Sequence, residues 1–234
     1  MPRHRLALLA LLSACTPTSI YTPERVYPPA SAPASAPAPP ARADARAPAP
    51  ACTEVIGLTV TDEWYSAGFE QLVDDARFQA RTRPHTFVEQ WADPVHPGWS
   101  QPLTSPCAQH DQNPDRVVLF AANWTFTSEA QWTSALEAFV TTVSQRDDRL
   151  RDIQLFTVLR GPKNQSCGDP KSVVDPMIDA AIAAVASRHP ERVHAGPKLE
   201  ATDCAVFEKG GPHFTPDGRK LVAQQLAQVL SSPK

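Results

Sequence analysis

The sequence predicts a single α/β domain of three layers, in which a parallel β-sheet is flanked by helices on both faces. Short runs that are apolar throughout alternate along the chain with segments of helical periodicity, a pattern typical of strands buried on both sides. Residues 52–234 supply 183 residues, which is enough for one domain with a sizeable core. The sequence contains no internal repeat, so we expect this one domain alone after residue 51.

The first 15 residues have the composition of an export signal. Arg3 and Arg5 precede an apolar run, 6–12, that is too short to span a bilayer. The run ends in Leu12-Ser13-Ala14-Cys15, which resembles the lipobox of bacterial lipoproteins. The resemblance implies a mature chain that begins at a lipidated Cys15 and, with Thr16 following, an outer-membrane location in the cell envelope. The alternative is an ordinary secretory signal with a chance cysteine.

Residues 16–51 are a second compositional region, with 10 Pro and 11 Ala among 36 residues. Such a segment buries little and is expected to be a disordered linker between the anchor and the domain. The domain itself has 17 basic and 23 acidic residues, which excludes a nucleic-acid partner that needs a basic excess. No apolar run reaches the ~20 residues of a membrane span, so we expect membrane contact only through the lipid.

The first half of the domain contains one clear strand and one expected helix. Val55–Thr61 is apolar and β-branched, ends at Asp62, and is predicted to be a buried strand. Ala67–Arg81 has helical spacing and is predicted to be a helix. Within the polar, proline-rich segment 82–115, the pair Phe87-Val88 is the only strand candidate.

The second half has stronger patterns. The three predicted strands are Val117–Ala121, Ile153–Leu159 and Arg192–Ala195. Each is followed by a predicted helix. The first is capped by Thr127 or Ser128, the second covers Val173–Val185, and the last begins at Thr215-Pro216-Asp217. In open parallel sheets, ligands bind outside the carboxyl ends of the strands. The loops that begin near Asp62, Asn123, Gly161 and Leu199 are therefore the expected site.

The segment Gly211-Pro212-His213-Phe214-Thr215-Pro216-Asp217-Gly218 resembles the last conserved block of the SGNH/GDSL hydrolases, in which a catalytic His precedes a Thr-Pro helix start. Thr61-Asp62-Glu63 lies where that family has Gly-Asp-Ser, Gly98 where its second block has Gly, and Asn123 where its third has Asn. The resemblance covers residues 52–234. It implies a flavodoxin-like α/β fold and hydrolysis of acyl esters, with His213, Asp62 and Glu63 in the site.

Two positions depart from the family pattern. Glu63 stands where the nucleophilic Ser is expected, and Gly210 stands where the acid that orients the His is expected. In a Ser-His-acid system the acid fixes the His tautomer and the His removes the Ser proton, so both substitutions affect the chemistry. The resemblance leaves an oxyanion hole formed by the Gly98 amide and the Asn123 side chain.

Other residues are candidates for the missing roles. Ser66, one turn after Glu63, offers a hydroxyl, although helix capping is an alternative role. Asp203 or Glu208 is close enough in sequence to orient His213, and Glu63 itself can pair with His213. Three tryptophans near these blocks are candidates for a stacking platform or for the core, namely Trp64, Trp99 and Trp124.

Two functions from different classes follow. The first is an envelope-anchored ester hydrolase with a rearranged triad around His213. The second is a catalytically inactive module that binds an envelope glycan or acyl group. Neither Cys-x-x-Cys nor His-x-x-x-His spacing occurs in the sequence, so we expect no metal and no cofactor. We expect a monomer.

Four cysteines remain after Cys15, and two disulfides formed in an oxidising compartment are the simplest interpretation. Cys52 and Cys107 both precede predicted strands, so in a parallel sheet they lie near its amino-terminal edge. Cys167 and Cys204 both follow strands and lie near the opposite edge. We therefore predict the pairs Cys52–Cys107 and Cys167–Cys204.

Overall fold

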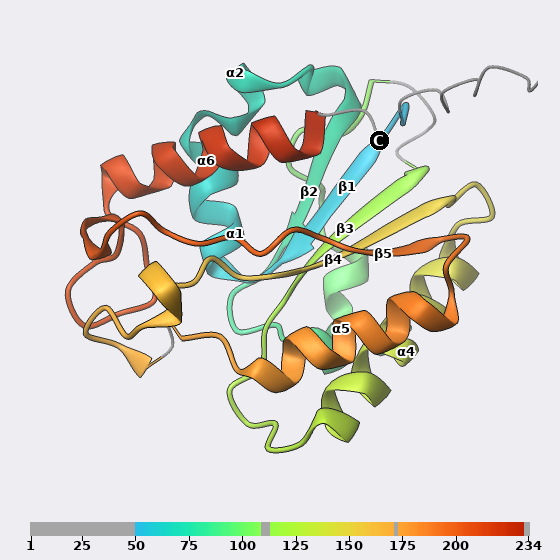
Figure 1. The fold of residues 1–234 in the computed structure, drawn as a ribbon. Helices are drawn as coiled ribbons and strands as arrows, with labels where there is room; N and C mark the ends of the chain where they lie inside the picture. Colours follow the sequence, from blue (N-terminus) through green and yellow to red (C-terminus); the bar gives the residue numbers. More distant parts are fainter. Residues whose placement is uncertain (1–49, 109–112, 171–172, 232–234) are drawn as a thin grey trace, which may run out of the picture. The chain divides into compact units, whose positions relative to one another are not determined.

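The structure is a computed structural model that describes residues 50–108, 113–170 and 173–231 (Figure 1). The predicted signal segment with Cys15 and the linker up to residue 49 lie outside the described residues. The described chain forms one parallel sheet in the order β2-β1-β3-β4-β5, which is the flavodoxin-like order. Its strands are β1 (Thr53–Gly57), β2 (Phe78–Thr82), β3 (Arg116–Ala121), β4 (Asp152–Thr157) and β5 (Val193–Ala195). The predicted three-layer α/β fold is confirmed.

Helices cover both faces of the sheet (Figure 1). On one face lie α1 (Thr59–Trp64) and α6 (Pro216–Ser231), and on the other lie α3 (Val88–Trp91), α4 (Glu129–Arg146) and α5 (Pro176–Arg188). Adjacent residues of one strand enter opposite cores, because side chains alternate along a strand. In β1, Val55 packs toward α1 and α6, whereas Ile56 packs toward α4 and α5. In the described part of the chain, no helix is long and apolar enough to cross a membrane.

The strongest sequence patterns formed the predicted elements. Ser128 caps α4, with its Oγ accepting from the Gln131 amide at 3.3 Å. The α5 cap is Asp175, whose Oδ1 accepts from the Met177 amide at 2.8 Å. The last helix begins at Pro216, directly after Thr215, as its sequence indicated.

The first predicted strand is wrong in its bounds. It ends at Gly57 rather than Thr61, and α1 begins at Thr59. The helix turns back tightly over the strand, since a Cβ on Gly57 would lie 2.1 Å from the Oγ1 of Thr61. Leu58 and Val60 are buried at the start of the helix, so the apolar run continues past the strand. Glu63 therefore lies in the helix, beyond the turn that follows the strand.

The predicted helix over Ala67–Arg81 is also wrong. A π-helical turn over Tyr65–Phe69 contains Gly68 at a φ of +110°, a conformation that breaks regular helix, and only the short α2 (Glu70–Leu72) follows. Phe78–Thr82 then forms β2, parallel to β1. A buried amide is one reason that β2 lacks an apolar pattern, because Gln79 is fully buried with its Nε2 donating to Glu54 at 2.7 Å.

The strand candidate Phe87-Val88 is also wrong, because Val88 is the first residue of α3. The Phe87 amide donates to the side chain of Gln90 at 2.5 Å, as in a helix cap. Val88 and Trp91 pack into the core beside α4, so the apolar residues of this segment belong to a helix face.

Both predicted disulfides are confirmed. Cys52 is bonded to Cys107, and Cys167 is bonded to Cys204, with sequence separations of 55 and 37 residues. Each bond closes a long loop and so restricts the unfolded chain. Two disulfides are compatible with an exported domain.

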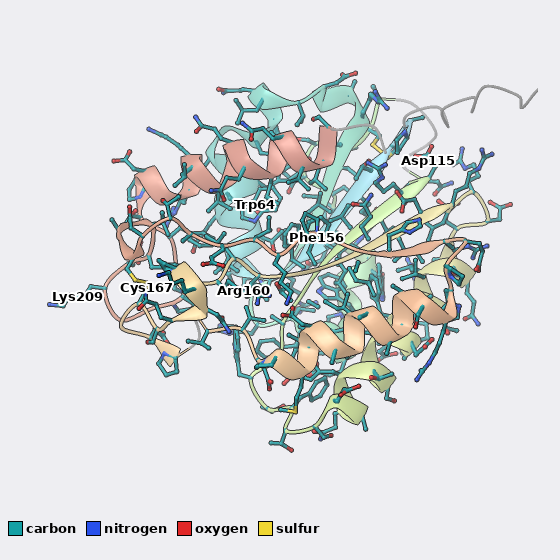
Figure 2. All side chains as sticks on the ribbon, in the orientation of Figure 1. Trp64, Asp115, Phe156, Arg160, Cys167 and Lys209 are labelled. Atoms are coloured by element: carbon teal, nitrogen blue, oxygen red, sulfur yellow. A yellow bond between two sulfur atoms is a disulfide. The ribbon has the colours of Figure 1, made fainter. Side chains whose placement is uncertain are left out.

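The chain enters the domain at the amino-terminal edge of the sheet. The amides of Ala51 and Cys52 donate to the carboxylate of Asp115 at 2.9 and 3.0 Å, and Arg77 Nε donates to the Pro50 carbonyl at 2.9 Å. Asp115 and Cys167 lie at opposite ends of the molecule in Figure 2. These bonds hold the first described residues firmly on that edge.

Candidate functional site

The structure brings Glu63 of α1 against His213, which lies just before α6. His213 Nδ1 is 2.5 Å from Glu63 Oε1, and the other carboxylate oxygen accepts from the Phe214 amide at 3.0 Å. An ionised carboxylate only accepts, so Nδ1 is the donor in this bond and Nε2 is the ring nitrogen left for other contacts. The Glu63 side chain is 11% exposed and that of His213 is 44% exposed. The imidazole is thus held by Glu63 on its Nδ1 side, while much of the ring remains open to solvent.

Arg219, in the first turns of α6, supports this pair. Its Nε lies 3.8 Å from Glu63 Oε2 and donates to the Phe214 carbonyl at 3.0 Å. The guanidinium therefore offsets the carboxylate charge and fixes the backbone beside His213. Sequence reasoning missed Arg219. The available signal was its position three residues after Pro216. This position places the Arg219 side chain at the N-terminal end of α6, next to His213.

A tight β-type loop presents His213. Phe207 and Phe214 form an antiparallel bridge, and the Glu208 amide donates to the His213 carbonyl at 2.8 Å. Gly210 lies at the turn with a φ of +79°, which a side chain rarely adopts. The loop follows Cys204, so the Cys167–Cys204 disulfide ties it to the segment after β4.

The two other acids proposed to orient His213 have different partners. Asp203 Oδ1 accepts from the Ala205 amide at 2.7 Å, and the Glu208 carboxylate lies 3.5 Å from Arg219. Glu63 is therefore the acid bonded to the imidazole, one of the alternatives that the sequence left open.

The site lies beyond the carboxyl ends of the strands. Phe214 lines a small apolar void together with Val60, which follows β1, and Val158 and Leu159, which follow β4. Ligands bind at this edge in folds of this class. Asp62 links the same region to β2, since its Oδ1 accepts from the Thr82 hydroxyl at 3.0 Å.

Two hydroxyl side chains that are not fully buried share the helix segment with Glu63, whereas Thr61 and Tyr65 are buried. Ser66 is exposed on the π-helical turn, three residues after Glu63. Thr59 is half-buried, is the first residue of α1, and lies one helical turn before Glu63. Thr59 was not singled out from the sequence, because the strand was predicted to extend through it.

The two predicted oxyanion donors are already engaged. The Gly98 amide donates to His96 Nδ1 at 3.2 Å. Asn123 is buried, its Nδ2 donates to Glu89 at 2.6 Å, and its Oδ1 accepts from the amides of Thr125 and Phe126 at 2.6 and 3.1 Å. Asn123 thus ties the loop after β3 to α3.

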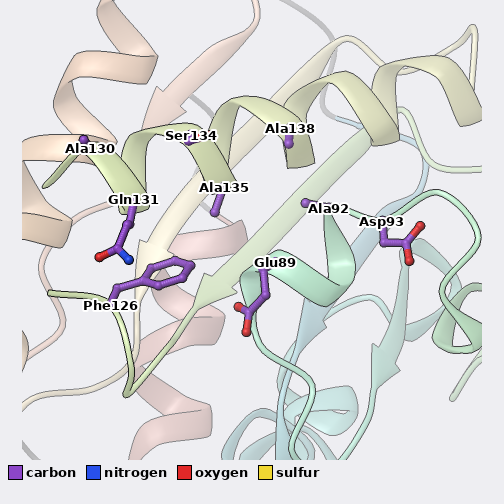
Figure 3. A pocket seen from close by; sticks show the side chains of 9 residues that line it. All are labelled: Glu89, Ala92, Asp93, Phe126, Ala130, Gln131, Ser134, Ala135 and Ala138. Atoms are coloured by element: carbon purple, nitrogen blue, oxygen red, sulfur yellow. The ribbon is translucent and has the colours of Figure 1, made fainter. Parts of the chain in front are cut away.

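The predicted stacking platform does not form, because Trp64 and Trp99 are buried in separate cores and only Trp124 is exposed. A surface groove of about 560 Å³ lies between α3 and α4 (Figure 3). Glu89, Asp93 and Phe126 line it together with alanines of α4. It lies on the face of the sheet opposite α1 and α6, away from His213. Within the described residues, no group of three or more potential ligands gathers for a metal.

A second charged cluster braces the carboxyl edge of the sheet. Buried Arg160 donates to both oxygens of Asp179 at 2.9 and 3.1 Å, and Lys198 Nζ lies 2.7 Å from the same carboxylate. Burial alone raises the pKa of Asp179, but the hydrogen bonds from Arg160 and Lys198 outweigh it and hold the pKa below its usual value. This cluster joins the loop after β4 to α5.

Comparisons with known proteins give little further information. No family model matches the chain, and no curated protein matches it. One solved structure with some similarity is the C-terminal catalytic domain of peptidoglycan O-acetyltransferase A (OatA) from Streptococcus pneumoniae, with a methylsulfonyl adduct. It is 13% identical, with a TM-score of 0.45, over 76% of this chain and 92% of that chain. The five-stranded sheet and its strand order define the fold of this domain.

Proposed function

We propose that this domain hydrolyses acyl esters, with His213 as the general base and Glu63 as the residue that orients it. The hydrogen bond of 2.5 Å between His213 Nδ1 and Glu63 carries the proposal. It presents Nε2 to solvent at the edge of the sheet where ligands bind, as a general base requires. Arg219 Nε lies 3.8 Å from the second oxygen of Glu63 and helps to hold the carboxylate in place.

The nucleophile in this proposal is the Thr59 hydroxyl. Nε2 takes the hydroxyl proton while Oγ1 bonds to the ester carbonyl carbon, and the alcohol leaves with that proton. Water then attacks the acyl-threonine, again with His213 as base, and releases the carboxylic acid. Thr59 is favoured over Ser66 because it directly follows the carboxyl end of β1, whereas Ser66 lies on the exposed turn further along.

Four variants test this assignment on an activated acetyl ester such as p-nitrophenyl acetate. His213→Ala and Thr59→Ala should each lower kcat/KM by about 10²–10⁴. Thr59→Ser should retain activity, and Ser66→Ala is the matched control that should leave it unchanged. Full activity in Thr59→Ala with loss in Ser66→Ala would move the nucleophile to Ser66. Wild-type turnover no faster than that of His213→Ala would refute hydrolysis.

A second candidate is a binding module for an envelope glycan or acyl group without turnover. The occupied donors at Gly98 and Asn123 favour it, because an oxyanion needs free donors aimed at it. Under this alternative, acetyl esters are not cleaved, yet glycan or acyl ligands protect the exposed His213 from chemical modification. Peptidoglycan fragments and acetylated glycans are suitable probes, with the Ser66→Ala variant as the folded control.

The location in the cell is also a proposal. We propose that Cys15 carries lipid and that residues 16–51 tether the domain in the bacterial envelope. In that case Cys15→Ser should move the protein from the membrane fraction to the soluble fraction of lysed cells. A wild-type protein that is already soluble after washing would contradict the anchor and leave an ordinary secretory signal.

A further inference from the structure

A cavity of about 90 Å³ lies at the amino-terminal edge of the sheet, opposite the edge that carries His213. It is enclosed by the first halves of β1 and β3, by the end of α4 and by the segment around Trp99. Its lining is mixed, and the apolar part is formed by Ile56, Trp99, Pro114, Val117, Val143 and Leu150. Four charged side chains also line it, namely Glu54, Arg81, Arg146 and Asp147.

Two of these charges satisfy each other. Arg81 Nε is 2.6 Å from Glu54 Oε1, and Glu54 Oε2 accepts from Gln79 at 2.7 Å. Arg81 Nη1 donates to the carbonyls of Trp99 and Gln101 at 2.9 and 3.2 Å. This pair is part of the scaffold and leaves little for a ligand.

Arg146 has no ion-pair partner among the residues that the structure describes. Its guanidinium carbon lies 4.5 Å from the centre of the Trp99 ring, and it makes no hydrogen bond with any residue that the structure describes. Burial and the charge of Arg81 lower its pKa, and Glu54 opposes them only in part. Arg146 is also exposed, so a ligand can reach it without unfolding. An anion beside it would relieve the repulsion from Arg81.

Asp147 provides the opposite charge. Its side chain is 7% exposed, and Oδ1 accepts from the Arg149 amide at 2.9 Å. Oδ2 is buried and has no hydrogen-bond partner among the described residues. An unpaired carboxylate oxygen in an apolar wall is costly, and an ammonium group would supply the missing donor.

We propose that this cavity binds a free α-amino acid with a small apolar side chain, of the size of glycine or alanine. The ligand carboxylate would bind Arg146, its ammonium would bind Asp147 Oδ2, and its side chain would face the apolar wall. Arg149 Nε lies 3.9 Å from Asp147 Oδ1, so a simple anion would leave only Oδ2 of this carboxylate without a partner. A simple cation would leave Arg146 without a counter-charge. A volume of about 90 Å³ suits a small ligand of this kind. The proposal is independent of the ester hydrolysis proposed above.

Calorimetric titration of the full-length protein tests this site. Glycine and both enantiomers of alanine are the ligands, with acetate, methylammonium and glycine methyl ester as comparators. We expect millimolar or tighter binding of the amino acids and at least tenfold weaker binding of each comparator, since each lacks one charge. Arg146→Gln and Asp147→Asn should each weaken amino-acid binding by at least tenfold. The matched controls Arg188→Gln and Asp148→Asn change exposed charges elsewhere and should leave binding unchanged.

Three results would overturn the proposal. If neither amino acid binds at millimolar concentration, the cavity holds water only. If acetate binds as tightly as glycine, the site is a simple anion site. If Arg188→Gln weakens binding as much as Arg146→Gln, the effect is not local. Should Asp147→Asn fail to fold, the comparator series on the wild type and Arg146→Gln still decide the question.

Discussion

Two glutamates near the start of the domain each bind a basic side chain, and the two pairs behave differently. Glu54 in β1 and Glu63 in α1 are nearly buried, at 5% and 11% exposure, and each uses both carboxylate oxygens. Arg81 is permanently charged and 11% exposed, whereas His213 is 44% exposed with Nε2 open to solvent. An imidazole exchanges protons in the neutral range and a guanidinium does not. The two carboxylates are therefore alike, and the pairs differ in the basic partner. Arg81 can only hold its glutamate in place, whereas His213 can also exchange a proton.

The largest expected effect comes from breaking the structural pair. Glu54→Ala leaves Arg81 and Gln79 without their buried acceptor and should lower the free energy of unfolding by about 3–5 kcal/mol. Urea denaturation measures this. Glu208→Ala, at an exposed and weaker contact with Arg219, is the control and should change stability by less than about 1 kcal/mol. A loss of similar size in both variants would contradict the distinction.

The next effect concerns the pair at His213 and rests on the proposed hydrolysis. Glu63→Gln keeps an oxygen for the Phe214 amide but no longer fixes the proton on Nδ1, so kcat/KM for an acetyl ester should fall about a hundredfold, or ~2.7 kcal/mol in barrier. The free energy of unfolding should change less than in Glu54→Ala. If Glu63→Gln destabilises the domain as much as Glu54→Ala while activity per folded molecule is unchanged, both pairs are structural.

A third pair, Arg160–Asp179, gives the smallest effect and shows the pH dependence of a structural bond. The pKa of Asp179 lies below its ordinary value of 3.8 in the folded protein, so its contribution to stability is complete above that value. The contribution is lost as the pH falls through the folded-state pKa, because protonation removes the charge. Asp179→Asn should therefore cost about 1–2 kcal/mol at neutral pH and progressively less below the ordinary value. A constant difference across this range would show that the ion pair contributes nothing.

The sequence predicted the elements whose side chains follow a regular period, and it failed where polar residues are buried or a helix packs tightly on a strand. In the second half of the domain, capping residues marked the starts of α4 and α6 correctly. Apolar spacing marked α5, but the helix begins at Pro176 and ends at Arg188, three residues later at each end than predicted. The strand β2 was missed because its most buried residue is Gln79, whose amide is satisfied by Glu54 on the neighbouring strand. That contact crosses strands, so no local pattern could reveal it.

The sequence predicted one contact of the candidate site and missed others that depend on how distant segments pack. The pairing of Glu63 with His213 was among the alternatives drawn from the sequence, and the structure contains it. The bounds of β1 were wrong, and Thr59, now proposed as the nucleophile, was therefore not considered. The engagement of Asn123 by Glu89 could not be foreseen either, since no helix was predicted around Glu89 and the preceding pair Phe87-Val88 was a strand candidate.

The clamp at residues 50–52 gives the domain a defined polarity. Asp115 and Arg77 hold residues 50–52 on the amino-terminal edge of the sheet, so the chain enters the domain there. The His213 loop lies past the opposite edge, at the distal pole. A domain suspended by its N-terminus would therefore direct His213 outward from its support. The cavity at the amino-terminal edge would then lie on the side of the support, and His213 on the side that faces away from it.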